Sequence, residues 1–585
     1  MNIKKIYKDI IFSFLIAILT LFIGLIVSFI FFKVMPQRSV YLPLHQGSAL
    51  LLMDFTPEYY DELPQQLGED YPLIIQFFRY IGNFFTGNWG VSISIKPGEE
   101  VLELIKERFL MMIEVLIFPV LVGLTVGILL GKIAIKYKKR WPDKVIRVLA
   151  ILGISAPVYW LGMLFQYIFS YKLGWLPTYG FKSGEWKYYI MPISILTIAI
   201  SSLITLQTRS TLESEPIEKS VILNTLIVGK SYGFVIMFYI LTEINFIMHG
   251  IGEMLMDTLY EYDIFLLSGL LFVLILILII ITFIANIIFS LYRNLLSKPT
   301  NDQPELYNKA NNAREAYSDI SSKVKIKNYL LRCLKSPFLI IGTFLVIFSI
   351  IVALFPQILT PYTLEETLDF YPNLEYPDQL PYMSPSKDHP LGTTKFGRDL
   401  LAVISWSVRD ILIVGIGASF IGLIGGSIFG FIAGRFNKKV YNVITGLMII
   451  VFVIPVLIIV LIITFIYGIR HIYLINISTI GIILIPSFTQ VIANALLKKS
   501  NFKRIIKAAI SYIPLNIAIA ILIYISFGFL DVFNPLGLPV LSYYIAEATA
   551  RLSTDPFAVF WPGFAIFMIL IGFLFLHEGL KDQLR

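Results

Sequence analysis

Charged residues are scarce in this 585-residue sequence: they make up only 15% of it, whereas hydrophobic residues make up 57%. Together with a mean hydropathy of +0.78, this composition excludes an ordinary soluble globular protein. The single cysteine, Cys333, excludes a disulfide framework, and the lack of a CxxC pair excludes the usual zinc and redox motifs. The five histidines are scattered without an HExxH motif, so we expect neither a metal site nor a cofactor.

What the sequence has instead is a series of apolar runs. Each run is about 20 residues long, the length that a helix needs to cross a hydrocarbon core of roughly 30 Å. The runs are continuously apolar rather than alternating, which favours helices over barrel strands. The sequence therefore predicts an all-α polytopic membrane protein with about 12 transmembrane helices. The spans are expected near residues 10–34, 109–135, 146–170, 188–208, 219–246 and 264–292, and near 337–358, 409–434, 441–467, 475–497, 506–530 and 556–577.

Basic and acidic residues are distributed unequally between the predicted loops. Segment 132–147 holds seven Lys and Arg against one acid, and segment 298–335 holds eight Lys and Arg. Segments 35–100 and 359–400 hold three basic residues each, against eight and seven acids. Because Lys and Arg are retained on the cytoplasmic side, we expect the basic segments and both termini inside a cell membrane. The net charge of +8 then reflects topology and does not indicate nucleic-acid binding.

The chain also contains an internal repeat. GKIAIKYKKRWPDKVI (131–146) aligns with GFIAGRFNKKVYNVI (430–444), and Pro157 and Pro192 pair with Pro455 and Pro486 at nearly the same offset. We therefore predict two parallel six-helix repeats with a pathway between them. The predicted units are a first half (1–296) with an external segment 35–107, a cytoplasmic linker (297–336), and a second half (337–585) with an external segment 359–407.

Several motifs match one known family. HPLGTTKFGRDLL (389–401) resembles the signature of the second transmembrane subunit of dipeptide/oligopeptide/nickel-type ABC importers, and WPGFAIFMILIGFLFLHEGLKDQLR (561–585) resembles the end of that subunit. PLIIQFFRYIGNFFTGNWGVS (72–92), ISAPVYWLGMLFQYIFSYKLGWLPTYG (154–180) and LTEINFIMHGIGEML (241–255) resemble the partner subunit. The chain is thus similar to two permease subunits joined into one.

The resemblance implies an importer for peptides or similar small solutes. Its implied partners are two ATP-binding cassette subunits and an external solute-binding protein, besides the lipid bilayer. ATP hydrolysis would then belong to the separate subunits, so the chain itself is not expected to be an enzyme. The implied vestibule contacts are His389, Gly392, Thr393, Gly397, Arg398 and Asp399, with Gln76 and Arg79 in the first half. A plain loop-to-helix cap without a partner is the alternative interpretation of 389–401.

The family pattern fails at the coupling loops. Importers of this type dock their ATPases on a cytoplasmic EAA-x3-G loop between the fourth and fifth spans. Here the corresponding segments, 208–220 and 497–516, are short and lack that pattern. The candidate ATPase-facing residues in these segments are Arg209, Glu213, Glu215, Glu218, Lys503, Arg504 and Lys507. The ATPases would dock on these shorter elements unless the chain is a relative that has lost ATP coupling.

Ionisable and small residues inside the spans supply further candidates. Lys230 and Glu243 lie in an apolar span, where charge is costly to bury, so they are candidates to line a substrate pathway. Snorkelling or a structural pairing is the alternative for Lys230, and a carboxylate at the membrane interface is the alternative for Glu243. Glycines recur every four residues at 123, 127 and 131 and at 422, 426 and 430, and we expect them to mark packing faces between the two halves.

Two other functions fit parts of this pattern. An ion-coupled secondary transporter would explain the missing coupling sequences but not the importer motifs. A receptor or scaffold without transport activity would associate with no ATPase and move no solute. The importer permease accounts for the largest number of independent motifs.

Overall fold

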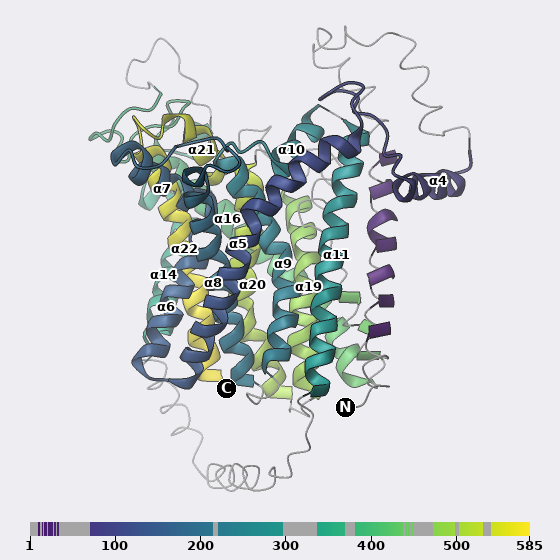
Figure 1. Ribbon diagram of the computed structural model, residues 1–585. Coiled ribbons are helices and arrows are strands. Elements are labelled where there is room, and N and C mark those ends of the chain that lie inside the picture. The colour runs from purple at the N-terminus through teal and green to yellow at the C-terminus, as the bar shows by residue number, and fades with distance from the viewer. Residues whose placement is uncertain are drawn as a thin grey trace, which may run out of the picture.

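The computed structural model describes residues 71–214, 220–295 apart from 262, 336–368, 381–436, 472–497, 502–530 and 540–584, with scattered residues in 10–33 and 440–448. These residues form a bundle of upright helices with shorter elements at one end (Figure 1). The described residues form no β-strand beyond two isolated bridges. The predicted all-α polytopic fold is confirmed.

Each half of the chain contributes its own set of helices. The first half contains α4 (Leu73–Thr86), α5 (Val101–Lys136), α6 (Trp141–Ser155), α7 (Val158–Phe165), a π-helical segment (Gln166–Lys172), α8 (Trp186–Ser214), α9 (Ser220–Asn245), α10 (Ile251–Tyr260) and α11 (Ile264–Leu295). The second half contains α14 (Pro337–Leu354), a 3-10 turn (Pro356–Ile358), α15 (Leu364–Leu368), α16 (Leu400–Arg435), α19 (Ile472–Leu497), α20 (Phe502–Phe529), α21 (Leu541–Ala548), a 3-10 turn (Thr549–Arg551) and α22 (Phe557–Leu584).

Seven helices of the described chain are long and apolar enough to cross a membrane, or eight if α6 and the bent segment after it count as one span. Of the predicted span 10–34 the structure describes part, and the described residues there are helical, whereas the predicted span 441–467 lies largely outside the described residues. Two helices begin earlier than predicted, α5 at Val101 and α16 at Leu400, so part of each predicted external segment is helical.

The predicted span 146–170 is not one straight helix. The chain bends by 91° between α6 and the segment that begins with α7. Proline disfavours helical geometry in the residue before it, and its ring nitrogen carries no hydrogen to continue the helical ladder. Ala156 and Pro157 accordingly have extended ψ angles of 113° and 132°. The bend directs α7 toward the second half.

The repeated glycines pack helices within each half. A Cβ added at Gly127 would lie 2.7 Å from Ile204, which places α5 directly against α8. A Cβ added at Gly426 would lie 2.4 Å from Phe488, which places α16 against α19 in the same way. Our prediction that these glycines lie between the halves was therefore wrong. Their physical role, close approach of two helix backbones, is the expected one.

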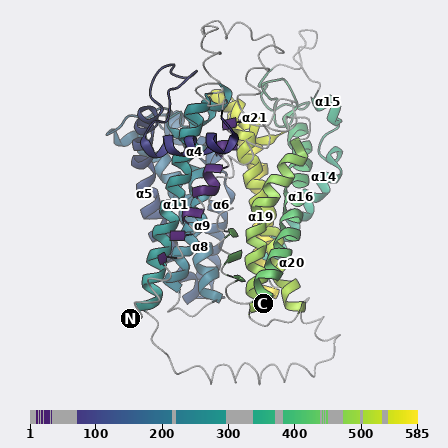
Figure 2. The same ribbon diagram turned by 90° about the vertical axis from the view of Figure 1, so that its right-hand side faces the viewer.

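The two halves meet through different helices. α6 and α7 pack against α22. Trp160 lies over Gly563, where an added Cβ would fall 1.9 Å from the indole ring. Figure 2 shows the helices of the two halves side by side, with α5, α8 and α11 on one side and α16, α19 and α20 on the other.

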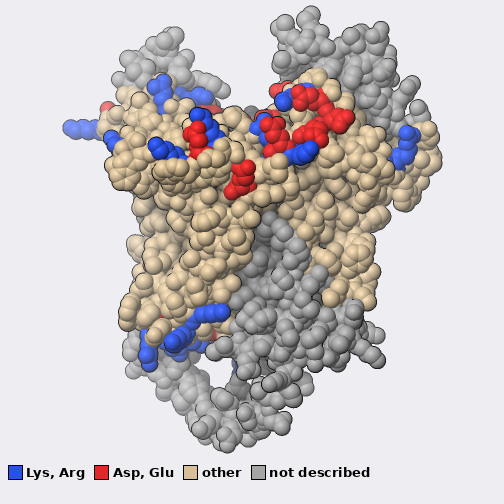
Figure 3. Space-filling model, viewed as in Figure 1, with Lys and Arg blue, Asp and Glu red and all other residues tan. Residues whose placement is uncertain are grey.

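The two ends of the bundle differ in charge: the upper end in Figure 3 carries both basic and acidic side chains, whereas the lower end shows mainly Lys and Arg on this face. We call the end that carries the turn between α5 and α6 the basic end, because Lys136, Lys138, Lys139 and Arg140 are exposed there. We call the opposite end, which carries α4, α10, α21 and the loop before α16, the acidic end (Figure 1). Carboxylates gather there around α10 and the start of α5.

Candidate functional site

The loop 389–401 folds into a compact cap on α16. Gly392 and Gly397 adopt φ angles of 87° and 73°, a region that residues with a side chain rarely enter. Asp399 is the N-cap of α16, and its Oδ1 accepts a hydrogen bond of 2.7 Å from the Ala402 amide. Its Oδ2 lies 3.0 Å from Nδ1 of His389. The motif thus closes on itself around the beginning of a helix.

Most of the predicted contact residues of this loop are buried within the chain, and contact of the loop with a binding protein stays a prediction. His389, Thr393, Arg398 and Asp399 are at most 7% exposed, and both of the loop's glycines are buried. Nη1 of Arg398 donates a 2.5 Å hydrogen bond to the Tyr544 hydroxyl of α21. The polar groups are turned inward because the helix end and α21 satisfy them there. Within the loop, Lys395 is the exposed charge, and it pairs with Glu547.

The other predicted vestibule contacts lie on α4. Arg79 is exposed, and its guanidinium lies 4.7 Å from the centre of the Tyr71 ring. Nε2 of Gln76 donates a 2.5 Å hydrogen bond to the Tyr71 carbonyl. α4 lies across the bundle at the acidic end (Figure 1). Contact of Arg79 and Gln76 with a binding protein stays a prediction.

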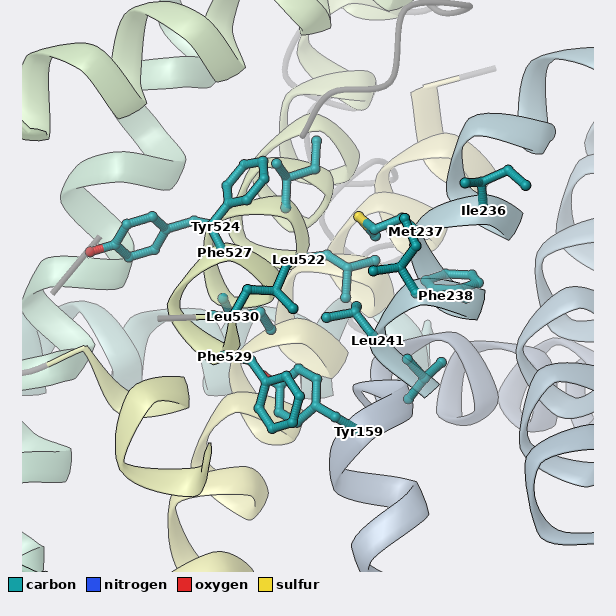
Figure 4. Close-up of a cluster of buried hydrophobic side chains, with 14 of the residues drawn as sticks. Tyr159, Ile236, Met237, Phe238, Leu241, Leu522, Tyr524, Phe527, Phe529 and Leu530 are labelled. Carbon is teal, nitrogen blue, oxygen red and sulfur yellow. The ribbon is translucent and has the colours of Figure 1, made fainter. Parts of the chain in front are cut away.

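Apolar side chains close the interface between the halves (Figure 4). The ring of Tyr159 on α7 stacks on that of Phe529 on α20, with centroids 4.2 Å apart and planes 9° from parallel. Around this stack, side chains of α9 face those of α20. The buried residues of this contact include Met237, Phe238 and Leu241 from α9, and Leu522, Phe527 and Leu530 from the α20 side. At this level the described side chains pack the interface between the halves with apolar groups.

A charged cluster joins the halves at the basic end. Nη1 of Arg147 on α6 lies 3.1 Å from Glu578 and 2.8 Å from Asp582, both on α22. Arg209 on α8 contacts both carboxylate oxygens of Asp143, at 2.6 and 3.0 Å. We call this set the basic-end ion cluster; its acids are Asp143, Glu213, Glu578 and Asp582, and its bases are Lys138, Arg147, Arg209 and Lys581. The set is balanced in charge, which is what burial of ionic groups requires.

The predicted pathway residues lie on α9. The structure describes no side chain for Lys230. The Glu243 side chain is fully buried, and its carboxylate accepts hydrogen bonds from the amides of Gly252 (3.0 Å) and Glu253 (2.8 Å). It thereby caps the N-terminus of α10, where negative charge is favoured. This contact is structural, and a part in substrate passage stays a prediction.

A small pocket of about 80 Å³ lies between α5 and α10 at the acidic end. Ionisable side chains of Glu107, Arg108, His249, Glu253 and Asp257 line it. Burial, followed by the nearby carboxylates of Glu253 and Glu261, raises the pKa of Asp257. All residues that line the pocket belong to the first half of the chain.

Comparison with known proteins assigns this chain to a family. Residues 123–218 match the model of the family described as binding-protein-dependent transport system inner membrane component. The glutathione transport system permease protein GsiC of Salmonella paratyphi A is 35% identical over 238 residues, covering 36% of this chain and 75% of the relative. GsiC of Escherichia coli K12 is 30% identical over 268 residues, covering 42% and 84%. The chain belongs to this family of ABC importer permeases.

The ATPase-facing residues predicted in the first half of this permease are placed differently from expectation. Arg209 lies inside α8 rather than in a loop and is 2% exposed, because its guanidinium is held by Asp143. The Glu213 side chain is 7% exposed and pairs with Lys138 at 3.1 Å. Neither of them is available at the surface to a partner. Glu215 and Glu218 lie outside the described residues.

In the second half of the permease, the residues predicted to face an ATPase are exposed. Lys503, Arg504 and Lys507 lie in the exposed first two turns of α20. Phe502, at the start of the same helix, is 76% exposed, and Ile506 is 41% exposed. A mixed apolar and basic surface of this kind is typical of a protein contact. Contact of this surface with an ATPase stays a prediction.

Sequence reasoning missed two parts of the site. In the sequence, Arg147 stands out only as a basic residue of a cytoplasmic segment and Glu578 does not stand out at all, although both charges sit within helical apolar surroundings. Tyr159 lies within a family motif that gives it no role of its own. An ionisable or hydroxylated residue at the rim of an apolar run is the signal that could have found them.

Proposed function

We propose that this permease chain supplies both transmembrane halves of an importer for peptides or similar small solutes. Residues 1–296 would form one half and 337–585 the other, joined by the linker 297–336. An external binding protein delivers the solute, and two separate ATP-binding cassette subunits supply the energy. The observation that carries the proposal is the kinship to permeases named for transport of glutathione, a tripeptide.

The alignment lengths support two permease units in one chain. Each alignment covers three quarters or more of the relative but less than half of this chain. The parallel glycine contacts of α5 with α8 and of α16 with α19 add a shared packing pattern. Two such bundles facing the same way would enclose one conduit between them.

The charge distribution supports an orientation. The basic end would face the cytoplasm, with both termini, and the acidic end would face outward in the cell membrane. A binding protein would then approach α4, α10 and α21. The ATPases would approach the basic end, where the first turns of α20 offer exposed apolar and basic side chains.

The closed interface gives this proposal a mechanism. The apolar side chains of α9 and α20 that meet here would close the passage in this conformation. ATPase closure would have to favour another arrangement of the halves through contacts that differ between the two states. The basic-end ion cluster links α6 and α8 to α22, so movement at that end would reach both halves together.

Purification of the full chain from its own cells tests the proposal. Two ATP-binding subunits are expected to copurify in detergent, and reconstituted vesicles should take up a tripeptide only with ATP and binding protein. Lys503→Glu combined with Lys507→Glu should release the ATPases. Lys106 is exposed on α5 at the opposite end, so Lys106→Glu should leave the ATPases bound. Uptake driven by an ion gradient without ATPases would instead establish a secondary transporter.

A further inference from the structure

Buried polar atoms without partners gather where the two halves meet at the acidic end. We call this set the interface polar cluster: Tyr159 and Gln166 of the bent segment, Thr242 and Asn245 of α9, and Ser542 of α21. Each side chain is at most 2% exposed. Among the described residues, no group pairs with Oε1 of Gln166, the Thr242 hydroxyl or either amide atom of Asn245, and the hydroxyls of Tyr159 and Ser542 have only each other as partners.

Direct contacts connect the members of the cluster. Oγ of Ser542 lies beside the Tyr159 hydroxyl and packs over Gly528, where an added Cβ would fall 2.4 Å from it. The Asn245 amide packs over Gly162 of α7 in the same manner, at 2.3 Å from an added Cβ. These two glycines leave room for polar groups that a larger residue would displace.

The remaining contacts place the cluster across the boundary between the halves. Nε2 of Gln166 donates to the carbonyl of Asn245 at 3.2 Å. Thr242 lies three residues before Asn245 and so on the same face of α9. The stack of Tyr159 on Phe529 forms an apolar wall beside the cluster (Figure 4). Ser542 belongs to the second half and the other members to the first.

In the closed state, these unpaired groups contribute no stabilising hydrogen bonds to the interface. A buried donor or acceptor without a partner destabilises the conformation that buries it. In a protein whose halves separate during transport, the same groups become accessible when the interface opens. They are then ready to pair with a solute, and their pairing stabilises the open, occupied state.

We propose that the interface polar cluster recognises uncharged peptide units of the transported solute when the halves separate at the acidic end. The cluster contains no ionised side chain. The Asn245 carboxamide offers N–H donors and a carbonyl acceptor, which match the C=O and N–H of a single peptide unit. The hydroxyls of Tyr159 and Ser542 add adjustable partners. This inference rests on the proposed function of peptide import and names the residues that bind the solute.

Transport by conservative variants tests the inference. Asn245→Leu removes two unpartnered polar atoms, so its thermal unfolding temperature should equal or exceed that of the parent. Tyr159→Phe and Ser542→Ala remove only the contact between these two hydroxyls, so each should lower the unfolding temperature by little. The KM for uptake of radiolabelled trialanine should rise at least fivefold, and most for Asn245→Leu. Thr479→Val is the matched control, because Thr479 is equally buried and unpartnered but lies on α19, which packs on α16 and α20 inside the second half.

A labelling experiment observes the site directly. In a Cys333→Ser background, Ser542→Cys should react with a membrane-impermeant maleimide at least tenfold faster during ATP-driven turnover than at rest. Trialanine should slow the reaction in that state, whereas maltotriose should not.

The outcomes separate the two proposals. Failure of the parent chain to take up peptide would overturn the proposed function and this inference together. Peptide uptake by the parent with unchanged KM in all three variants would overturn the inference alone. Loss of unfolding temperature in parallel with transport would assign the cluster a structural role, and protection by maltotriose as well would overturn its preference for peptide units.

Discussion

Replacing Arg147 by Met should destabilise the contact between the halves. Met keeps most of the side chain's length but removes the charge that neutralises Glu578 and Asp582, which lie 3.1 and 2.8 Å from Nη1. The Arg147 side chain is only 4% exposed, so solvent does not replace the lost partner. It also lies 4.4 Å from the ring of Phe338 on α14, a second contact with the second half.

The size of the effect follows from the geometry. Two unit charges about 4 Å apart interact by about 4 kcal/mol at an effective dielectric constant of about 20. Removal of one member of a buried ion pair typically costs about 3–5 kcal/mol. We expect the lower part of this range, about 3 kcal/mol, because Glu578 keeps Lys581 at 3.3 Å and Arg209 at 3.8 Å.

The assay is thermal unfolding of the purified chain in detergent, followed by intrinsic fluorescence. Arg147→Met should lower the unfolding temperature clearly, and adding Glu578→Gln should recover part of the loss, because the orphaned charge is then gone. Lys106→Met is the matched control, since its pair with Glu103 is 63% exposed on both sides and contributes about 1 kcal/mol at most. Equal unfolding temperatures for Arg147→Met and Lys106→Met, or purely additive effects of Arg147→Met and Glu578→Gln, would refute this reasoning.

Three further substitutions probe the fold. Gly426→Ala should reduce the yield of monodisperse protein in size-exclusion chromatography, because the added Cβ would fall 2.4 Å from Phe488. Gly82→Ala on α4 is the control: its added Cβ meets nothing within 4 Å, so this variant should behave as the parent. Asp399→Ala removes the cap of α16 and should lower the free energy of unfolding by about 1 kcal/mol. Asp399→Asn keeps a good capping residue, so its unfolding temperature should fall less than that of Asp399→Ala. Glu243→Ala leaves the amides of Gly252 and Glu253 unpaired and should cost about 1–3 kcal/mol; faster amide exchange at those two positions is the diagnostic, and unchanged exchange would contradict the capping role.

The fold class was accessible from the sequence because lipid imposes a strong one-dimensional constraint. Runs of about 20 apolar residues can satisfy their backbone only as helices, and the positions of Lys and Arg separate one end from the other. The family motifs of the first half led to the kinship that the glutathione permeases confirm. The 91° bend at Pro157 was not predicted, because the sequence analysis used this proline only as a marker of the internal repeat.

The candidate site was only partly accessible, as the loop 389–401 illustrates. Its glycines and adjacent charges correctly indicated a structured turn before a helix. Whether Arg398 and Asp399 face a partner or the chain itself depends on α21, which lies far along the chain and supplies Tyr544 to Arg398. Likewise, four-residue spacing identified the glycines of α5 and α16 as packing sites but did not name the helices that they contact.

The sequence alone determined that this chain is helical, lies in a membrane, distributes its basic and acidic residues unequally between its loops and resembles importer permeases, since each of these follows from local composition and spacing. The tertiary structure alone decided that Arg147 binds Glu578, 431 residues away, and that Tyr159 stacks on Phe529 at the closed interface. The physical reason is that hydrophobic periodicity records which face of a helix is apolar. It carries no information about which distant helix covers that face or which buried charge neutralises another.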